Sequence, residues 1–300
     1  MEKILVIGAG TMGSGIAHVF AMSGFNTTIV DISEMQLQKA KSTIEKNLER
    51  QIAKGTLTNE MKSETMERLT FEINLEDVAH HSDLIIEAAT EQFELKSKIF
   101  NTLSNMTASN VILATNTSSI SITKLASHVK NPERVIGMHF MNPVPIMQLI
   151  EVIRGYNTSD EVCTQIMDIS RKLGKTPVQV EDYYGFVSNR ILMPMINEAI
   201  ITLFEGVAGV EEIDTVMKLG MNHPMGPLQL ADFIGLDVCY YILNVLYDGF
   251  KNPKYAPCPL LENMVLANKL GVKSGEGFYL YNAETKEKTV SPHFLTKNKS

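Results

Sequence analysis

The chain has 300 residues, of which 44% are hydrophobic and 20% are charged, as in ordinary globular proteins. This length predicts roughly two domains. The formal net charge of −7 argues against broad nucleic-acid binding, and no apolar run reaches the roughly 18 residues that a membrane span needs.

The chain begins with a short apolar strand at residues 4–7 that runs directly into the glycine-rich segment 8–13, Gly-Ala-Gly-Thr-Met-Gly. An apolar-faced helix follows, and a second strand at residues 27–31 ends in Asp31, 18 residues past the last glycine. A strand, a G-x-G-x-x-G turn, a helix and an acid in this order predict a dinucleotide-binding site.

Each residue of the glycine segment has a predicted task at the phosphates. Gly8 permits the tight turn, Gly10 lets the backbone approach a pyrophosphate, and Gly13 lets the helix pack close to the strand. Thr11 and Met12 lie at the helix N-terminus, where backbone N–H groups and the helix dipole favour phosphate. We therefore count all five among the cofactor-binding residues.

Asp31 predicts the kind of dinucleotide. Its carboxylate would accept hydrogen bonds from the ribose hydroxyls and repel a 2′-phosphate. Neither Ile32 nor Ser33 is basic. The sequence thus favours NAD over NADP.

A helix is predicted from Ser33 to Lys54, with Ser33 and Gln36 as a capping box and Gly55 as its stop. One side is apolar at helical spacing, and the other carries a positive stripe of Lys39, Lys46, Arg50 and Lys54. Such a stripe is either a solvated helix face or a surface that attracts an anionic ligand.

The remaining pattern predicts two structural regions. Further strands are expected at residues 84–87, 111–115, 134–139, 149–153 and 178–180, alternating with helices, which predicts an α/β, Rossmann-like, mostly parallel sheet over residues 1–183. Helices are expected at residues 187–204 (kinked by Pro194), 210–219, 228–247 and 260–270. We therefore predict an all-α C-terminal domain over residues 184–283, and a loose polar tail at 284–300.

Polar residues collect where the predicted parallel strands end. Asp31, Glu87, the segment 116–119 and His139 each follow a different strand. Ligands bind beyond this edge of an open sheet, so we count Asn116 with the cofactor residues. Taken alone, Ser118 is also a good N-cap for a helix at residues 120–129.

His139 and Glu151 form a predicted pair. Glu151 interrupts the apolar run 149–153, and a charge there is expensive unless it is paired. Pairing with His139 on the adjacent strand would remove this cost, hold one imidazole tautomer and stabilise the imidazolium. The alternative is that Glu151 faces solvent on an edge strand. The nearby nucleotide site favours an acid/base dyad beside a nicotinamide.

Several ordered motifs resemble the L-3-hydroxyacyl-CoA dehydrogenase family, most closely its bacterial 3-hydroxybutyryl-CoA dehydrogenases. The motifs are the segment 8–13, Asn-Thr-Ser-Ser at 116–119, His-Phe-Met-Asn-Pro-Val-Pro at 139–145, Gly-Phe-Val-Ser-Asn-Arg at 185–190, Pro-Met-Gly-Pro at 224–227 and Gly-Glu-Gly-Phe-Tyr at 275–279. The likeness extends from residue 1 to about residue 281. The family also includes a gulonate dehydrogenase and a lens crystallin.

The resemblance implies a role for each catalytic position. His139 would be the general acid/base, Glu151 its orienting partner, and Ser118 and Asn189 would contact the substrate 3-oxygen and the histidine. Asn142 would lie near the nicotinamide. The other positions implied around the cofactor are Glu91, Lys96 and Lys273.

The resemblance also implies that Lys54 holds coenzyme A. Coenzyme A carries several phosphates, which gives the positive stripe, Arg50 included, a purpose beyond solvation. We therefore expect Lys54→Glu to raise the KM for the CoA substrate while NADH affinity stays nearly unchanged.

Together these features predict an oxidoreductase that interconverts (S)-3-hydroxybutyryl-CoA and acetoacetyl-CoA. A free hydroxy-acid dehydrogenase, a non-catalytic NADH-binding protein like the crystallin, and, last, a nucleotide-binding regulator stay open. We expect a homodimer formed through the helical domain, and neither nucleic-acid nor membrane partners. Three scattered cysteines without a C-x-x-C favour the cytoplasm, and no metal-ligand spacing is present.

Overall fold

A computed structural model describes residues 1–282, 285 and 287–295. The chain divides into two compact units, Met1–Tyr183 and Tyr184–Ser300, which are described separately below. The last residue of the predicted helical domain, residue 283, and parts of the predicted tail, residues 284, 286 and 296–300, lie outside the described residues.

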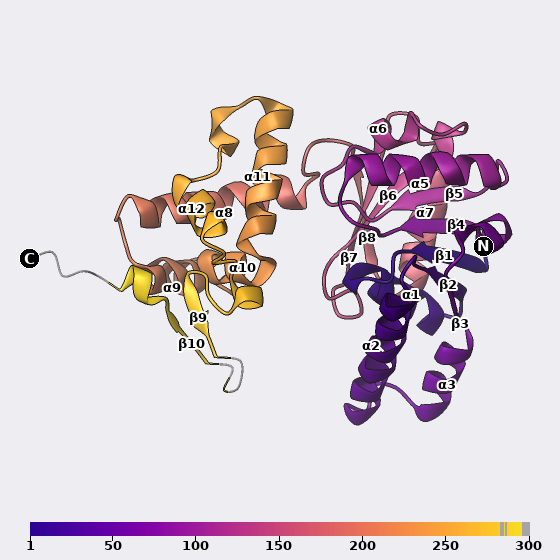
Figure 1. Cartoon of the computed structure of the whole chain (residues 1–300), viewed down its shortest axis with the longest axis horizontal. Helices are drawn as coiled ribbons and strands as arrows, with labels where there is room; N and C mark the ends of the chain where they lie inside the picture. Colours follow the sequence, from indigo (N-terminus) through magenta and orange to yellow (C-terminus); the bar gives the residue numbers. More distant parts are fainter. Residues whose placement is uncertain (283–284, 286, 296–300) are drawn as a thin grey trace, which may run out of the picture. The chain divides into compact units, whose positions relative to one another are not determined.

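The first unit is built on one eight-stranded sheet with strand order β3-β2-β1-β4-β5-β6-β7-β8 (Figure 1). All neighbouring strands are parallel except β6 and β7, which run antiparallel. The strands are β1 (Lys3–Ile7), β2 (Asn26–Val30), β3 (Leu69–Glu72), β4 (Leu84–Glu87), β5 (Ile112–Thr115), β6 (Val135–Phe140), β7 (Leu149–Arg154) and β8 (Thr176–Glu181). The predicted mostly parallel, Rossmann-like sheet is confirmed.

Helices cover the sheet on both faces, with α1 and α2 on one side and α5 and α6 on the other (Figure 1). On the face that α1 and α2 cover, their apolar sides meet the strands in a core that includes Ile4, Phe20, Ile86 and Met138. The helices are α1 (Thr11–Met22), α2 (Glu34–Ala53), α3 (Asn59–Glu67), α4 (Leu75–Val78), α5 (Phe93–Met106), α6 (Ile122–Ala126) and α7 (Asp160–Lys172), with 3₁₀ turns at Ala79–His81 and Pro132–Arg134.

Two helix starts test the predicted caps. The Ser33 hydroxyl accepts a hydrogen bond from the Gln36 N–H at 3.4 Å, so the predicted N-cap of α2 is confirmed. The Ser33 N–H donates to Asp31, so the second half of the predicted capping box is wrong. The predicted cap at Ser118 is wrong, because α6 begins only at Ile122 and its N-cap is Ser121. Ser118 therefore lies in the turn between β5 and α6.

The second unit is mainly helical. Its helices are α8 (Ser188–Phe204), α9 (Val210–Gly220), α10 (Pro227–Ile234), α11 (Leu236–Phe250) and α12 (Pro259–Leu266), with 3₁₀ turns at Pro253–Tyr255, Val272–Ser274 and Pro292–Phe294. The single helix predicted over residues 228–247 is wrong, because Gly235 adopts φ +105° and separates α10 from α11. Glycine adopts such a conformation without steric cost.

The second unit also holds a short antiparallel strand pair, so the prediction of a purely α-helical domain is wrong in this detail. Strand β9 (Tyr279–Tyr281) pairs with β10 (Lys288–Val290). β10 lies within the segment predicted as a loose tail, and backbone pairing with the apolar β9 orders it. The polar composition that predicted a tail does not indicate this pairing with residues 7 to 11 positions earlier in the chain.

Within the described part of the chain, no single helix is long and apolar enough to cross a membrane, and only α10 and α11 counted together, with a 97° bend between them, pass that test. All three cysteines are buried and none forms a disulfide. Among the described residues, no three His, Cys, Asp or Glu side chains are grouped as metal ligands.

Candidate active site

The glycine turn between β1 and α1 is shaped by steric limits at each glycine. Gly8 adopts φ +102°, and a Cβ there would lie 2.7 Å from the Ala88 carbonyl oxygen. A Cβ on Gly13 would overlap the carbonyl oxygen of Gly8. Around Gly10, by contrast, no atom comes within 4 Å of a Cβ position. The turn is therefore closed toward the sheet and open at Gly10, as an approaching pyrophosphate requires.

Asp31 closes the other side of this turn. Its carboxylate accepts hydrogen bonds from the Ala9 N–H at 2.8 Å and the Ser33 N–H at 2.9 Å. Asp31 also lines a cavity of about 770 Å³ at the ends of β1, β2 and β4, together with Gly8 and Gly10. This volume suits a drug-sized or nucleotide-sized ligand. The residues present thus fit the adenosine half of a dinucleotide.

His139 and Glu151 lie directly opposite each other on the antiparallel strands β6 and β7. Nδ1 of His139 is 2.8 Å from Oε2 of Glu151, and both residues are buried. The predicted pairing is confirmed, and the alternative of a solvent-facing Glu151 is wrong. Because a carboxylate only accepts, Nδ1 carries the proton, and Nε2 of the neutral ring is an acceptor.

Ser118 lies against the other ring nitrogen. Its Oγ is 3.0 Å from Nε2 of His139, which completes a Glu–His–Ser chain of hydrogen bonds. The backbone N–H of Ser118 donates to Oε1 of Glu91 at 2.9 Å. The hydroxyl and the imidazole therefore face one place beyond the strand ends, where a substrate oxygen could meet both.

Two predicted cofactor residues, Glu91 and Lys96, meet just behind this place. Lys96 is fully buried, and its Nζ lies 2.8 Å from Glu87 and 3.3 Å from Glu91. Glu91 is partly exposed at the surface of the site. Both lie close to the Ser118 turn, and their predicted contact with the cofactor stays a prediction.

Two predicted cofactor residues lie on the segments before and after His139: Asn116 at the end of β5 and Asn142 just after β6. The Asn116 side-chain oxygen accepts the Phe140 N–H at 2.9 Å and so joins the ends of β5 and β6. Asn142 lies in the loop between β6 and β7. Lys175 holds this loop, since its ammonium donates to the carbonyl oxygens of Val144 at 2.6 Å and Met147 at 2.7 Å.

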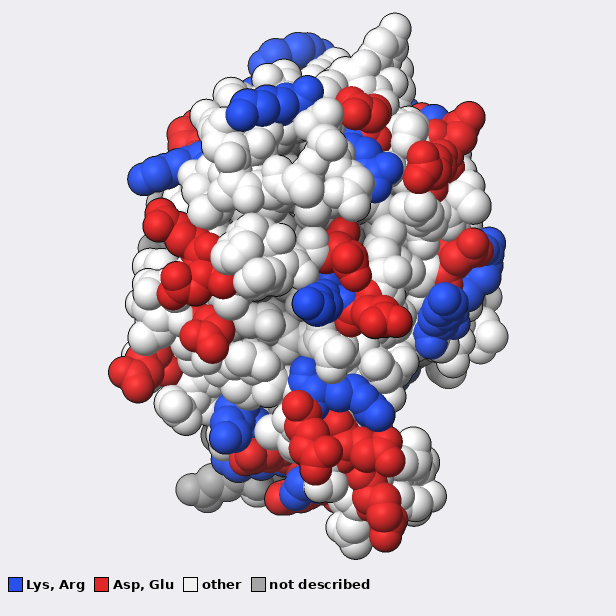
Figure 2. Space-filling model, turned by 90° about the vertical axis from the view of Figure 1, so that its right-hand side faces the viewer, with Lys and Arg blue, Asp and Glu red and all other residues white. Residues whose placement is uncertain are grey.

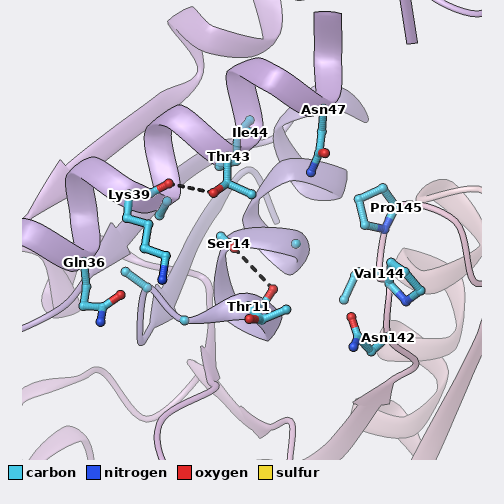
Figure 3. A pocket seen from close by; sticks show the side chains of 15 residues that line it. Thr11, Ser14, Gln36, Lys39, Thr43, Ile44, Asn47, Asn142, Val144 and Pro145 are labelled. Atoms are coloured by element: carbon cyan, nitrogen blue, oxygen red, sulfur yellow. Dashed lines mark hydrogen bonds between the residues drawn. The ribbon is translucent and has the colours of Figure 1, made fainter. Parts of the chain in front are cut away.

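A second cavity, of about 340 Å³, lies between helix α2, the start of α1 and the loop that carries Asn142. Figure 3 shows Lys39 and Asn47 of α2 on one side of it, Thr11 of α1 at its base, and Asn142 on the other side. Lys39 places a cationic side chain at the wall of this cavity. Gly10 lines both this cavity and the larger one, so the glycine turn separates two ligand-sized spaces.

Comparison with known proteins agrees with this geometry. Residues 3–183 match the 3-hydroxyacyl-CoA dehydrogenase NAD binding domain, and residues 185–281 match the 3-hydroxyacyl-CoA dehydrogenase C-terminal domain. The chain belongs to the 3-hydroxyacyl-CoA dehydrogenase family. The resemblance seen in the sequence motifs is confirmed.

Relatives in this family match over nearly the whole chain. A 3-hydroxybutyryl-CoA dehydrogenase of Bradyrhizobium diazoefficiens is 50% identical over 281 residues, which cover 94% of this chain and 96% of the relative. One of Clostridioides difficile is 48% identical over 280 residues, covering 93% and 99%. The crystal structure of an (S)-3-hydroxybutyryl-CoA dehydrogenase from Ralstonia eutropha matches with a TM-score of 0.91 at 48% identity, covering 94% of this chain and 99% of that one.

Two further predicted site residues, Asn189 and Lys273, belong to the second unit. Asn189 is buried in the first turn of α8, and its N–H donates to the Gly185 carbonyl oxygen at 3.1 Å. Lys273 forms an ion pair with Asp237 at the start of α11. The roles expected for Asn189 and Lys273 stay predictions.

Arg50 and Lys54 are exposed near the end of α2, beyond the residues that line the smaller cavity. Acidic side chains gather at the lower end of the face in Figure 2, where the ends of α2 and α3 lie in Figure 1. Near the same end of α2, Glu49 forms an ion pair with Lys62 of α3 at 2.9 Å. The positive stripe therefore borders acidic neighbours, and the predicted contacts of Arg50 and Lys54 with coenzyme A stay predictions.

Sequence reasoning placed Lys39 in the positive stripe but missed the polar residues that line the smaller cavity with it. Lys39, Thr43 and Asn47 line this cavity at four-residue intervals along α2. That spacing places residues on one side of a helix and was a usable signal. Lys175 carried no such signal, because its two acceptors are carbonyl groups of a distant loop.

Proposed function

We propose that this protein interconverts (S)-3-hydroxybutyryl-CoA and acetoacetyl-CoA by hydride transfer with a nicotinamide cofactor. The observation that carries the proposal is the position of His139, held by Glu151 on one ring nitrogen and by Ser118 on the other, at the sheet edge that also bears the glycine turn. The relatives named above act on this substrate by name.

The chemistry at the substrate oxygen belongs to His139. In the oxidative direction Nε2 accepts the 3-hydroxyl proton, and Glu151 stabilises the imidazolium that forms. In the reductive direction the imidazolium donates that proton to the 3-keto oxygen. The Ser118 hydroxyl helps to orient the keto group. When bound, the nicotinamide accepts the hydride from C3 or supplies it. Acid/base help of this kind is worth about 10² to 10⁴ in rate.

The cofactor is NAD in preference to NADP. Asp31, Glu76 and Asp77 all line the larger cavity, and among the residues that line it there is no lysine or arginine. A 2′-phosphate brought to this rim would meet carboxylates and no cation, whereas ribose hydroxyls can donate to them. The acidic rim thus favours the cofactor without the extra phosphate.

The coenzyme A part of the substrate lies along α2. Lys39 opens onto the smaller cavity beside Asn142, and Arg50 and Lys54 continue the positive stripe toward the helix end. Phosphate groups of coenzyme A would interact with these cations, and the uncharged arm would occupy the cavity.

The second unit mediates a homodimer. Large apolar side chains are exposed on its helices, among them Ile191, Phe204, Leu219 and Phe233. Exposed apolar residues in such number favour an interface with another copy. Sedimentation should show a dimer at micromolar concentration, and a monomer would contradict this part of the proposal.

Steady-state oxidation of NADH and NADPH, each with acetoacetyl-CoA and with free 3-keto acids, tests the proposal. We expect turnover with acetoacetyl-CoA and NADH that exceeds every other combination. Turnover of the free acid alone would instead support a gulonate-type dehydrogenase. Binding of NADH without turnover of any substrate would support a structural, crystallin-like protein. His139→Ala should lower kcat by at least about 10²-fold.

A further inference from the structure

A buried group of two carboxylates and one ammonium lies behind the turn that carries Ser118. Glu87 ends β4 and Lys96 lies in the first turns of α5, and both are 0% exposed. Nζ of Lys96 lies 2.8 and 2.9 Å from the two oxygens of Glu87, 3.3 Å from Oε2 of Glu91 and 3.3 Å from the Ala89 carbonyl oxygen. Four oxygen atoms from two carboxylates and one carbonyl group therefore surround the three N–H bonds of the ammonium.

The second oxygen of Glu91 holds the Ser118 turn. Oε1 accepts hydrogen bonds from the Thr117 hydroxyl at 2.6 Å, the Ser118 N–H at 2.9 Å, and the Ser119 N–H and hydroxyl at 3.1 Å each. Three consecutive residues are thus fastened to one carboxylate oxygen. The Ser118 hydroxyl carried by this turn lies 3.0 Å from His139.

We propose that Glu87 is a positioning residue for the dehydrogenase reaction: it fixes the Lys96 ammonium, which fixes Glu91 and thereby the Ser118 hydroxyl against His139. The inference rests on the proposed function for the identity of the reaction, and on the contacts above for the role of Glu87. The path runs from Glu87 to Lys96, from Lys96 to Glu91, and from Glu91 to the Ser118 turn. Glu87 therefore acts on Ser118 through Lys96 and Glu91.

The physical reason lies in how one ammonium is shared between two carboxylates. A buried ammonium is stable only when it is paired, and Glu87 supplies most of that pairing because it meets Lys96 with both oxygens. Without the Glu87 charge, Lys96 is drawn to Glu91 alone. Glu91 must then give up part of its geometry with the Ser118 turn, and misplacement by about 1 Å near a reacting group can cost about 10²-fold in rate.

Thr115 offers a matched control. Its hydroxyl donates to Oε2 of Glu87 at 2.7 Å, from the strand beside β4. Thr115→Val removes a buried hydrogen bond to the same carboxylate but leaves the path from Glu87 through Lys96 to Ser118 intact. It therefore reports what a purely structural loss at Glu87 does to the enzyme.

The test compares the full-length variants Glu87→Gln, Thr115→Val, Ser118→Ala and the double variant of Glu87→Gln with Ser118→Ala. We measure kcat with acetoacetyl-CoA and NADH, the KM of NADH, and urea unfolding. Glu87→Gln should lower kcat by about 10- to 100-fold with the KM of NADH changed less than about threefold. Thr115→Val should change kcat less than about twofold. In the Ser118→Ala background, Glu87→Gln should cost less than about threefold, because both act on one hydroxyl.

Two results would overturn the inference: equal kcat losses in Glu87→Gln and Thr115→Val, or the same loss from Glu87→Gln with and without the Ser118 hydroxyl. If Glu87→Gln does not fold, Glu87→Asp takes its place with the same expected pattern, since it keeps the charge but shortens the reach to Lys96. No turnover by the unmodified protein would overturn the proposed function and this inference with it. Turnover by the unmodified protein with unaffected Glu87 variants overturns the inference alone.

Discussion

Glu151→Gln tests the contribution of the carboxylate to the acid/base step. The side chain is 2% exposed, and its oxygen lies 2.8 Å from Nδ1 of His139. Glutamine has nearly the same size, and its amide oxygen can still accept a hydrogen bond from Nδ1–H of His139, so the ring stays in place. What it lacks is the negative charge beside an imidazolium.

The magnitude follows from the difference between a charged and a neutral hydrogen bond. A hydrogen bond to a charged group is worth about 1.5–3 kcal/mol and one between neutral groups about 0.5–1.5 kcal/mol, so the charge of Glu151 adds about 1–1.5 kcal/mol once the ring of His139 takes up the substrate proton. Since each 1.36 kcal/mol is about tenfold in rate, kcat for 3-hydroxybutyryl-CoA oxidation should fall by roughly 5- to 13-fold. The KM of either substrate should change little, because the amide oxygen still accepts the hydrogen bond from Nδ1–H and leaves the ring in place.

The assay is steady-state formation of NADH, with circular dichroism as a check on folding. Glu181→Gln is the matched control, since it makes the same substitution at an exposed carboxylate on the neighbouring strand β8. A loss smaller than about threefold in folded Glu151→Gln, or an equal loss in the control, would refute the reasoning about His139 and its partner.

Three further predictions concern pH, substrate and cofactor. Burial lowers the pKa of His18 to about 4 from 6.5, so the unfolded chain takes up a proton between these values that the folded chain does not, and stability falls as pH drops from 6.5 to 4. Urea unfolding should show this acid loss reduced by about 3 kcal/mol in His18→Gln, and parallel pH curves would contradict it. Lys39→Glu should raise the KM for acetoacetyl-CoA about fivefold, and by more than Lys54→Glu, with the KM of NADH unchanged; equal KM values in the unmodified protein and Lys39→Glu would remove Lys39 from the site. Glu76→Lys should lower the KM for NADPH roughly fivefold relative to NADH at low salt, and an unchanged ratio would show that this rim does not discriminate.

Much of the first unit could be predicted because its signals are local. The glycine spacing requires a specific turn, and apolar runs indicate every strand of the sheet except β3. Even the β6–β7 register followed from one residue, since an acid in an apolar run needs a partner and His139 is the one that faces it. Strand β3 escaped because Leu69–Glu72 is short and only its first residue is buried.

The features that sequence reasoning missed are not marked by the hydrophobic pattern of their own segment. The helices α10 and α11 share one apolar pattern, and only the positive φ of Gly235 separates them. The pairing of β10 with β9 joins residues with different compositions. The hydrogen bond from Thr117 to Glu91 joins residues 26 positions apart, so no local pattern of charges could indicate it.

The antiparallel pairing of β6 with β7 separates two kinds of evolutionary change. A single-residue insertion inside β7 ahead of Glu151 would turn its carboxylate to the opposite side of the sheet and remove it from His139. Insertions in residues 141–148, between the two strands, leave the facing positions as they are. Descendants of this sequence can thus lengthen or shorten the connecting segment, and vary what it meets, while the proton-transfer pair is inherited unchanged.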